Sequence, residues 1–551
     1  MAESQNSARS ITNQLWAMAN ELRGNMDASE FRNYILGFLF YRYLSENQET
    51  YLKTQDLLDL KGDESVNEAY LREATGGDLN DYLQDIAESL GYAMPPESTW
   101  ATIVSKVEQD EIRTSDFQDM FDNFEKNALL NPNSMADFRG IFADINLGNS
   151  RLGNSTAARG KALSNIVTMV NTFDYNDKNG HDILGDVYEY LIAQFAGNSG
   201  KKAGEFYTPH EVSQVLAKLV TLNLQEEGDQ FTVFDPAMGS GSLLLTVGSE
   251  VPGGYKSGRV HFHGQELNTT TYNLARMNLM MHGVSYQNMT LRNADSLEMD
   301  WPDGVDAQGI DHPRSFNAVV ENPPYSAHWD NQDSKMKDVR FKEYALAPKS
   351  KADFAFLLDG LYHLNNSGTM AIVLPHGVLF RGAKEGKIRQ ALLDKHQIDA
   401  IIGMPAGLFY STSIPTIIMV LKKQRQNDDV FFIDASRNFE KGKNQNKLRA
   451  EDIEKIISTY KKRQNIDKYA HVANMDEIKE NEYNLNIPRY VDTFEPEPPV
   501  DVDKLVQDIQ STDEQIVKLE SEFSGMLNDL DGKNPDAQQQ LTKIKELFKN
   551  E

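Results

Sequence analysis

The sequence contains no cysteine. Disulfide bonds, thiolate metal sites and cysteine nucleophiles are therefore excluded, and no metal site is expected, which fits a reducing compartment. It also lacks any run of about 18 apolar residues, so we expect no transmembrane helix. The first residues do not join a basic segment to an apolar one, so no secretory signal is expected. Together these absences predict a cytoplasmic protein without a membrane partner.

Basic residues are scarce, since 55 Lys and Arg stand against 82 Asp and Glu, for a net charge of −27. DNA binding usually calls for clustered cations, so a chain this acidic is not expected to grip DNA strongly by itself. If DNA is the substrate, a basic partner would supply much of the grip. Two local stretches, 334–351 and 437–449, are basic, and each is either a phosphate contact or a solvated loop.

With 551 residues, of which 40% are hydrophobic, the chain is long enough for two or three domains. Residues 1–165 are predicted to form an α-helical N-terminal domain. Ile11, Leu15, Met18 and Leu22 recur at helical spacing, and 31–44 is apolar enough for a buried helix. Further amphipathic helices are expected over 80–90, 100–108 and 115–130. No catalytic constellation occurs here, so this part is interpreted as a scaffold.

Residues 166–490 alternate short apolar runs with helical patterns, which is typical of a parallel sheet with crossover helices. We expect strands at 232–234, 260–263, 289–292, 318–320, 369–374 and 398–403. Two further runs, 416–421 and 430–433, are predicted to form an antiparallel pair at the edge of the sheet. Ligands of such folds bind beyond the carboxyl ends of the strands.

Residues 491–551 are predicted to form a helical tail behind a proline-rich linker at 495–499. Apolar residues alternate at spacings of three and four, interrupted only by Thr512, which indicates a heptad seam. Its positions are Val502, Leu505, Ile509, Ile516, Leu519, Phe523, Met526 and Leu530. Pro535 interrupts the pattern before a second short helix. The seam needs a partner, which is either the chain's own N-terminal helices or another subunit.

A glycine turn follows the first predicted strand, in Asp235-Pro-Ala-Met-Gly239-Ser-Gly241. The glycines allow a tight turn and a close approach of backbone to a ligand, and the missing lysine argues against a nucleoside triphosphate. At the end of the second strand, Glu266 can accept both hydroxyls of a ribose. After the third strand, Asp295 can accept the amino group of an adenine. These residues predict a nucleoside cofactor, and upstream the aromatic pair Phe206-Tyr207, before Thr208-Pro209, can cover its other end.

The sharpest motif is Asn322-Pro323-Pro324-Tyr325, directly after an apolar strand. The amide oxygen of Asn322 and the carbonyl of Pro323 can accept the two hydrogens of an amino group conjugated to a ring. Those bonds draw the nitrogen toward tetrahedral geometry and aim its lone pair at an electrophile. The prolines keep these acceptors preorganised, and Tyr325 offers a face for a base to stack on. With the glycine turn, the motif predicts an amino-group methyltransferase that uses S-adenosylmethionine.

The chain resembles the modification (methyltransferase) subunits of type I restriction–modification systems over nearly its whole length. The resemblance rests on residues 22–26, 204–209, 235–241, 264–268, 322–325 and 483–490. It implies a Rossmann-like S-adenosylmethionine-dependent domain of α/β class, with a helical N-terminal domain and a C-terminal helical tail. It also implies methylation of adenine N6 in double-stranded DNA. The target base must then be flipped out of the duplex.

The same resemblance implies two modification subunits with one sequence-reading specificity subunit, and further association with a translocating restriction subunit. The C-terminal helices would dock on the specificity subunit, which would give the seam its partner. We assign catalysis to Asn322, Pro323, Pro324 and Tyr325. We assign cofactor binding to Glu205, Phe206, Tyr207, Thr208, Pro209, His210, Asp235, Gly239, Ser240, Gly241, Ser242, Glu266 and Asp295.

Three other hypotheses stay open. Methylation of a protein glutamine amide also uses the Asn-Pro-Pro-Tyr motif, but enzymes of that kind are shorter and lack this N-terminal domain and tail. Methylation of cytosine N4 is chemically closer, although serine commonly replaces the residue at Asn322 in such enzymes. The third is an idle subunit that binds cofactor and only scaffolds an assembly, against which the intact Asn322 and Tyr325 argue. Methylation of cytosine C5 is excluded because it needs a cysteine nucleophile.

Overall fold

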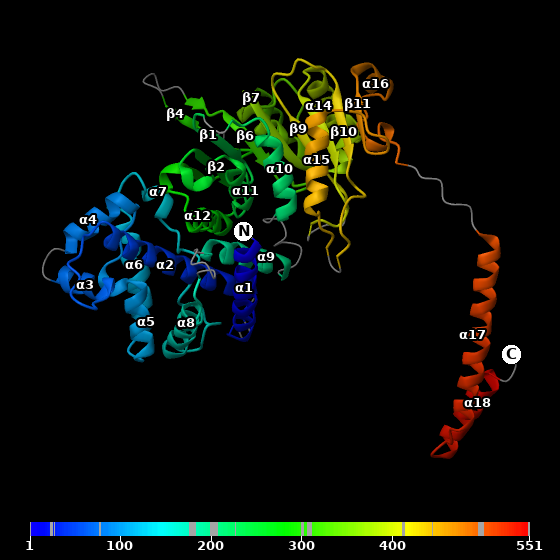
Figure 1. The fold of residues 1–551 in the computed structure, drawn as a ribbon, viewed down its shortest axis with the longest axis horizontal. Helices are drawn as coiled ribbons and strands as arrows, with labels where there is room; N and C mark the ends of the chain where they lie inside the picture. The colour runs from blue at the N-terminus through cyan, green and yellow to red at the C-terminus, as the bar shows by residue number, and fades with distance from the viewer. Residues whose placement is uncertain are drawn as a thin grey trace. The chain divides into compact units, whose positions relative to one another are not determined.

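The computed structural model describes residues 2–22, 26, 28–75, 79–175, 183–198, 208–225, 228–298, 302–305, 311–409, 414–442, 445–493 and 501–548. The chain divides into two compact units, Met1–Asp492 and Thr493–Glu551, and each is considered separately. Figure 1 labels many of their helices and strands. None of the described helices combines the length and the apolar character needed to cross a membrane.

The N-terminal part of the first unit is helical, as predicted. Its helices are α1 (Ala2–Leu22), α2 (Ala28–Thr54), α3 (Val66–Glu73), α4 (Leu79–Leu90), α5 (Trp100–Glu108), α6 (Thr114–Asn127), α7 (Met135–Phe138), α8 (Thr156–Asn171) and α9 (Leu184–Asn198). The central helix is α2, whose apolar residues from Phe31 to Leu44 are almost all buried. The hydroxyl of its buried Tyr41 donates to the carbonyl of Ser98 at 2.7 Å, which satisfies the only polar atom of that side chain. The predicted buried helix is therefore confirmed.

A mixed sheet of nine strands forms the rest of this unit within the described residues. Its strands are β1 (Phe231–Asp235), β2 (Val260–Glu266), β3 (Met289–Asn293), β6 (Phe316–Glu321), β7 (Leu364–Pro375), β8 (Ile398–Gly403), β9 (Thr416–Leu421), β10 (Val430–Asp434) and β11 (Ala470–Ala473). They lie in the order β11-β10-β8-β9-β7-β6-β1-β2-β3. β4 (Pro302–Val305) and β5 (Asp311–Pro313) form a separate antiparallel pair.

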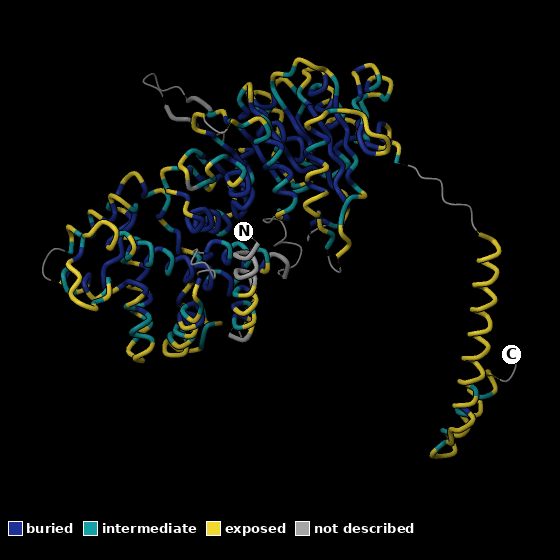
Figure 2. The backbone as a smooth tube through the Cα atoms, in the orientation of Figure 1, coloured by how far each residue is buried: buried dark blue, intermediate teal, exposed yellow. Residues whose placement is uncertain are grey.

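Helices cover both faces of the sheet (Figure 1). They are α10 (His210–Thr221), α11 (Ser242–Glu250), α12 (Thr269–Met281), α13 (Asp353–His363), α14 (Ala383–Asp394), α15 (Ala450–Lys462) and α16 (Met475–Glu480). Successive β6 residues point to opposite faces, so Val320 joins the apolar layer of α10, α11 and α12, whereas Val319 joins that of α13 and α14. Figure 2 shows the resulting sheet as a buried centre. The predicted α/β class is confirmed.

The predicted antiparallel edge pair is wrong. β9 lies inside the sheet, antiparallel to both β7 and β8, and β10 runs parallel to β8. All six residues of β9 are buried, from Thr416 to Leu421, as is typical of a strand in the interior of a sheet that is covered on both faces. The antiparallel edge pair consists of β10 and β11. The sequence pattern did not predict β11, because its apolar run is too short.

The second unit consists of α17 (Val502–Asn528) and α18 (Pro535–Leu547), the two helices predicted on either side of Pro535. Phe523 of α17 meets Phe548 edge to face, with ring centroids 5.0 Å apart. The seam residues are nevertheless open to solvent, since Leu519 is 63% exposed and Met526 66%. Figure 2 shows α17 as exposed along nearly its whole length.

Candidate active site

The glycine turn connects the end of β1 to the start of α11. Gly239 and Gly241 both have positive φ, of 55° and 76°. The positive φ favours glycine at 241, and a Cβ there would lie 2.6 Å from Leu279 Cδ1 of α12, so the leucine side chain would have to move. Asp235, at the end of β1, is buried and accepts a hydrogen bond from the Ala237 backbone N–H at 2.9 Å. The turn is therefore rigid before any ligand binds.

Two acidic side chains follow the neighbouring strands. Glu266 accepts from the Gly239 N–H at 3.2 Å and from the Asn268 N–H at 2.7 Å, so it joins the end of β2 to the glycine turn. Asp295 accepts from the Leu297 N–H at 3.0 Å beyond β3. The neighbouring Ser296 hydroxyl donates to the Pro236 carbonyl. Three strand ends are thus tied together at one edge of the sheet.

Burial changes the acidity of this edge. It raises the pKa of Asp235 to about 8, against the opposing effect of the Ala237 N–H, and it also raises the pKa of Glu266. Glu321, the last residue of β6, is fully buried, and burial raises its pKa well above the ordinary value, with further contributions from Asp235 and Asp359. Neither carboxylate oxygen of Glu321 has a hydrogen-bond partner among the described residues. Burial therefore favours the protonated form of Glu321, which lies directly before the Asn-Pro-Pro-Tyr motif.

The amide of Asn322 is held from both sides. Its Nδ2 donates to Thr208 Oγ1 at 3.0 Å, and its Oδ1 accepts from the hydroxyl of Tyr325 at 2.7 Å. Burial raises the pKa of Tyr325, so its phenol stays protonated and can only donate to that oxygen. A carbonyl oxygen has two lone pairs, so Asn322 Oδ1 retains one for a further donor. The amide is therefore oriented as an acceptor.

The structure brings an aromatic residue to this motif that the sequence analysis missed. The ring of Phe409, which follows β8 at the same edge of the sheet, meets the ring of Tyr325 edge to face at 6.0 Å. Its position at the carboxyl end of a strand was the available signal. Because ring pairs at this distance form apolar walls, Tyr325 and Phe409 together suit a flat ring.

The chain leaving the motif is also fixed. Ser326 has φ of 53°, and its backbone N–H donates to Asp353 Oδ1 at 2.8 Å. Asp353 starts α13, is fully buried, and its other oxygen lies 3.4 Å from Arg381 Nη1. Arg381 also pairs with Glu385 at 2.9 Å. A left-handed conformation costs a non-glycine residue about 1–2 kcal/mol, and the bond from the Ser326 N–H to Asp353 holds the backbone in it. Sequence reasoning missed Asp353 because it lies 27 residues after Ser326.

A small cavity joins the two motifs. Its walls are Thr208, Asp235, Ala237, Met238, Gly239, Ser240, Ser242, Leu243 and Asn322. Asn322 thus lies in the same cavity as the glycine turn, although 80 residues and more separate them in the sequence. Among the predicted cofactor residues, Glu205, Phe206 and Tyr207 lie outside the described residues. His210 is exposed, and its ring bonds to Gln214 of its own helix at 3.2 Å, while Pro209 caps that helix.

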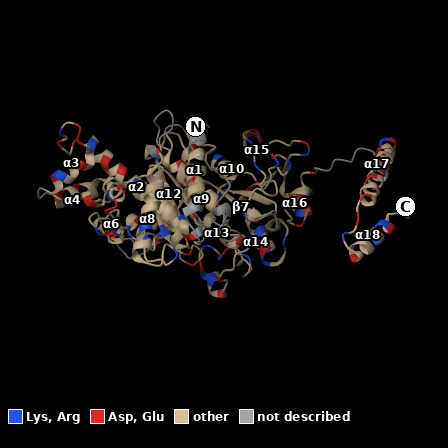
Figure 3. Ribbon diagram, turned by 90° about the horizontal axis from the view of Figure 1, so that it is seen from below, with Lys and Arg blue, Asp and Glu red and all other residues tan. Residues whose placement is uncertain are grey.

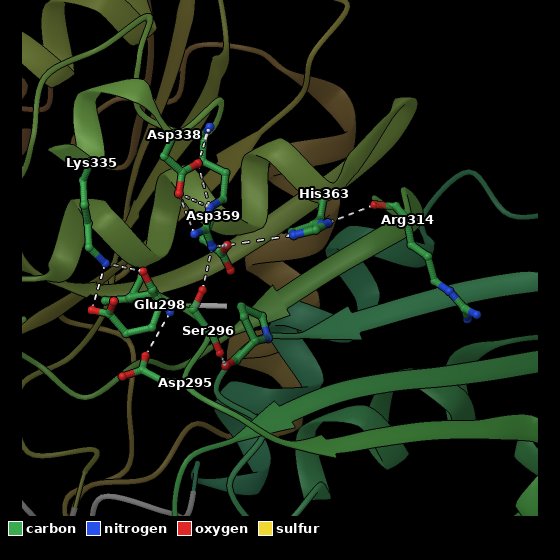
Figure 4. A network of polar contacts seen from close by, with 11 residues as sticks. Asp295, Ser296, Glu298, Arg314, Lys335, Asp338, Asp359 and His363 are labelled. Atoms are coloured by element: carbon green, nitrogen blue, oxygen red, sulfur yellow. Dashed lines mark hydrogen bonds and ion pairs between the residues drawn. The ribbon is translucent and has the colours of Figure 1, made fainter. Parts of the chain in front are cut away.

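In the basic stretch 334–351, some of the cations form hydrogen bonds and ion pairs within the fold (Figure 4). Arg340 is only 2% exposed, and its Nη1 lies 2.6 Å from both Asp359 Oδ1 and the Ser296 carbonyl. Lys335 donates to the Leu297 carbonyl at 2.7 Å and to Glu298 Oε1 at 2.8 Å. These two cations anchor the segment beneath the sheet edge. The exposed cations of the stretch are Lys337, Lys342 and Lys349.

Known proteins resemble this chain throughout. A family model described as N-6 DNA Methylase matches residues 179–498, and one described as HsdM N-terminal domain matches residues 11–170. The type I restriction enzyme MpnII methylase subunit of Mycoplasma pneumoniae is 36% identical over 94% of this chain and 96% of that protein. The MjaVII methylase subunit of Methanocaldococcus jannaschii is 29% identical over 89% of this chain and 80% of that protein.

A solved structure agrees. The type I restriction-modification system methyltransferase subunit from Streptococcus thermophilus has 43% identity and a TM-score of 0.79, and the match covers 88% of this chain and 100% of that one. The family matches account for both the helical part and the sheet. The chain therefore belongs to the N-6 DNA methylase family, as a type I restriction enzyme methylase subunit that methylates adenine N6 in DNA.

Proposed function

We propose that the cavity between the glycine turn and Asn322 binds S-adenosylmethionine beside the target adenine. The arrangement that carries this proposal is the amide of Asn322, fixed by Thr208 and Tyr325 in the wall of the same cavity as Gly239. The residues fit the cofactor, because the turn offers backbone without side chains and Glu266 lies at the end of β2, where it can accept ribose hydroxyls. Leu267, which follows it, is 67% exposed and offers an apolar surface to an adenine ring.

When bound, the cofactor supplies an electrophilic methyl group on its sulfonium. The protein's part is to make the adenine amine nucleophilic. Asn322 Oδ1 and the Pro323 carbonyl accept its two hydrogens and draw the nitrogen lone pair out of conjugation. Preorganised acceptors of this kind act without reorganisation at the moment of reaction. The proton leaves the nitrogen after the methyl group has been transferred, so no strong base is required.

The target base reaches this site only outside the duplex. We assign its binding surface to the aromatic pair Tyr325 and Phe409. The pair is supported by its 6.0 Å spacing and by its place next to the amide of Asn322. The hydroxyl of Tyr325 donates to Asn322, so only the face of its ring is available for the base to stack on. The two acceptors select a base with an exocyclic amine, and they do not read the surrounding sequence.

Sequence reading and much of the grip on DNA fall to partners. The proposal is supported by the net charge of −27 and by the commitment of Lys335 and Arg340 to internal contacts. We propose an assembly of two such chains with one specificity subunit in the cytoplasm, joined by a translocating restriction subunit. The exposed seam of α17 is the surface through which the chain would bind the specificity subunit.

The test is transfer of a labelled methyl group from S-adenosylmethionine to genomic DNA lacking the modification, followed by nucleoside analysis. The chain is assayed alone and with the specificity subunit of its own system. We expect N6-methyladenine only with the partner. Robust transfer by the chain alone would contradict the assignment of DNA reading to a partner. Absence of transfer in both mixtures would contradict the catalytic proposal.

A further inference from the structure

Helix α12 lies against the glycine turn on one side. The Nδ2 of Asn278 donates to the Ser240 carbonyl at 2.9 Å, and both residues are buried. Leu279 fills the space in which Gly241 would otherwise carry a side chain. The turn therefore rests directly on this helix. Figure 3 shows α12 with few charged positions, consistent with a helix enclosed by protein on several sides.

The first turn of α12 holds the other cofactor-binding element. Asn268 is the N-cap, and its Oδ1 accepts from the Thr271 N–H at 3.0 Å. The backbone N–H of the same Asn268 donates to Glu266 Oε1 at 2.7 Å. An N-cap bond fixes the start of a helix, so the position of Glu266 follows that of α12. The helix α12 thus holds both the glycine turn and the carboxylate of Glu266.

The opposite face of α12 is held by the N-terminal helical domain. Asp144 accepts from Thr270 Oγ1 at 2.6 Å and from Asn273 Nδ2 at 2.7 Å. Arg276, which is 2% exposed, donates through Nη1 to the carbonyls of Asp137 and Arg139 at 2.9 and 3.0 Å. Thr270, Asn273 and Arg276 are spaced by three, which places them on one helical face. Hydrogen bonds to charged groups are among the stronger ones in proteins.

We propose that the N-terminal helical domain sets the affinity for S-adenosylmethionine by positioning α12. The inference rests on the proposed cofactor site. It assigns Asp144 as a positioning residue that touches no ligand, because its two bonds fix the helix from which the turn and Glu266 are held. A packed helix shifts as a unit, so loosening its outer face displaces both cofactor elements together. The domain is then more than a scaffold.

The first experiment compares full-length Asp144→Ala with wild type by calorimetric titration of S-adenosylmethionine. We expect the Kd to rise about fivefold or more, the lower range of coupling between sites. Hydrogen exchange should accelerate at 238–242 and 266–268. Asp144→Asn, which keeps one acceptor oxygen, should recover part of the affinity. An unchanged Kd in Asp144→Ala would overturn the proposal.

The matched control is Asp116→Ala. Asp116 lies in the same domain, accepts from the Arg113 N–H at 2.6 Å and pairs with Lys106 at 3.3 Å, and contacts no part of α12 through these bonds. The Asp116→Ala variant loses a comparable set of bonds. An equal rise in Kd in this variant would mean that the effect comes from general destabilisation, and it would overturn the proposal. Thr270→Val, which removes one bond to Asp144, tests the same link if Asp144→Ala does not fold.

Kinetics of the assembled complex provide the second measurement. We expect the KM for S-adenosylmethionine to rise in Asp144→Ala while kcat at saturating cofactor stays near the wild-type value, because Asn322 is held by other elements. A fall of kcat with unchanged KM would contradict positioning of the cofactor elements. If wild-type protein itself binds no S-adenosylmethionine, the proposed function fails first, and that outcome is distinguishable from failure of the coupling alone.

Discussion

Asn322 shows how a single side chain acquires a defined role from its neighbours. An amide can be turned either way round, and in this structure the Nδ2 of Asn322 donates to Thr208 Oγ1 while its Oδ1 accepts from the hydroxyl of Tyr325. Burial raises the pKa of Tyr325, so the phenol keeps the proton that it donates. The residue type was evident in the sequence, whereas its orientation depends on a threonine more than a hundred positions away.

Replacing Asn322 by alanine removes the amine acceptor and leaves the glycine turn intact. We expect Asn322→Ala to lower kcat about 10²-fold or more, as loss of one preorganised polar group does elsewhere. The Kd for S-adenosylmethionine should stay within a few-fold of wild type. Asn331→Ala is the control, since its amide donates to the Ala347 carbonyl away from the cavity. Retained methylation by Asn322→Ala would contradict the mechanism.

The buried Asp235 makes stability depend on pH. Its pKa is raised to about 8 in the folded chain, above the ordinary value of 3.8. Between those values the folded chain keeps a proton that the unfolded chain has released. Stability therefore falls as pH rises from about 4 to 8, at up to about 1.4 kcal/mol per pH unit from this group, and levels off above 8.

Asp235→Asn removes that dependence and isolates it from the other buried acids. We expect the Tm of the variant, relative to wild type without ligand, to increase steadily between pH 5 and pH 8. Thermal unfolding at constant ionic strength measures it. A constant difference in Tm across this range would mean that the carboxylate of Asp235 is ionised in the folded protein.

At the scale of elements, the site depends on the connection from β6 to α13. The strand delivers Asn322 to the edge of the sheet, and the start of the helix fixes the chain beyond Tyr325 through Asp353. Local patterns predicted the strand and the motif. They did not predict that a helix residue would accept from the Ser326 N–H, because that bond depends on how α13 packs against the sheet.

Asp353→Ala should therefore impair catalysis, although Asp353 itself is not expected to contact the substrate. Loss of its carboxylate frees the Ser326 backbone and leaves the Arg381 guanidinium with Glu385 alone. We expect kcat to fall about tenfold or more, since small misplacement of reacting groups is costly. Asp353→Asn keeps an acceptor and should be affected less. Equal activity of wild type and Asp353→Ala in the assembled complex would contradict this role.

At the scale of the whole molecule, charge and the tail point to dependence on partners. The chain is acidic as a whole, with a net charge of −27, and two cations near the site are used internally. Within the second unit taken alone, the apolar seam along α17 is exposed, and apart from Thr512 it has the spacing of a coiled-coil interface. Exposed apolar surface of this kind is typical of protein interfaces, which supports the proposal that the specificity subunit binds there.

Charge placed on that seam should break the assembly and spare the cofactor site. We expect Ile516→Glu with Leu519→Glu to weaken association with the specificity subunit about tenfold or more, as loss of central interface residues does. Lys518→Glu, which lies off the seam and is exposed, is the matched control. Analytical ultracentrifugation measures association, and S-adenosylmethionine titration checks the site. Unchanged association of the double variant would exclude this surface as the interface.

Much of this protein follows from its sequence. The helical N-terminal part, the strands, the glycine turn and the Asn-Pro-Pro-Tyr motif are local, because each depends on residues within one or two elements. The place of β9 inside the sheet, the aromatic partner Phe409 and the bond from Ser326 to Asp353 are not local. They arise from packing between distant segments. The sequence alone determined which chemical groups are available, and the tertiary structure decided which of them meet. Residues far apart in the sequence come into contact only when the strands and helices that carry them pack together.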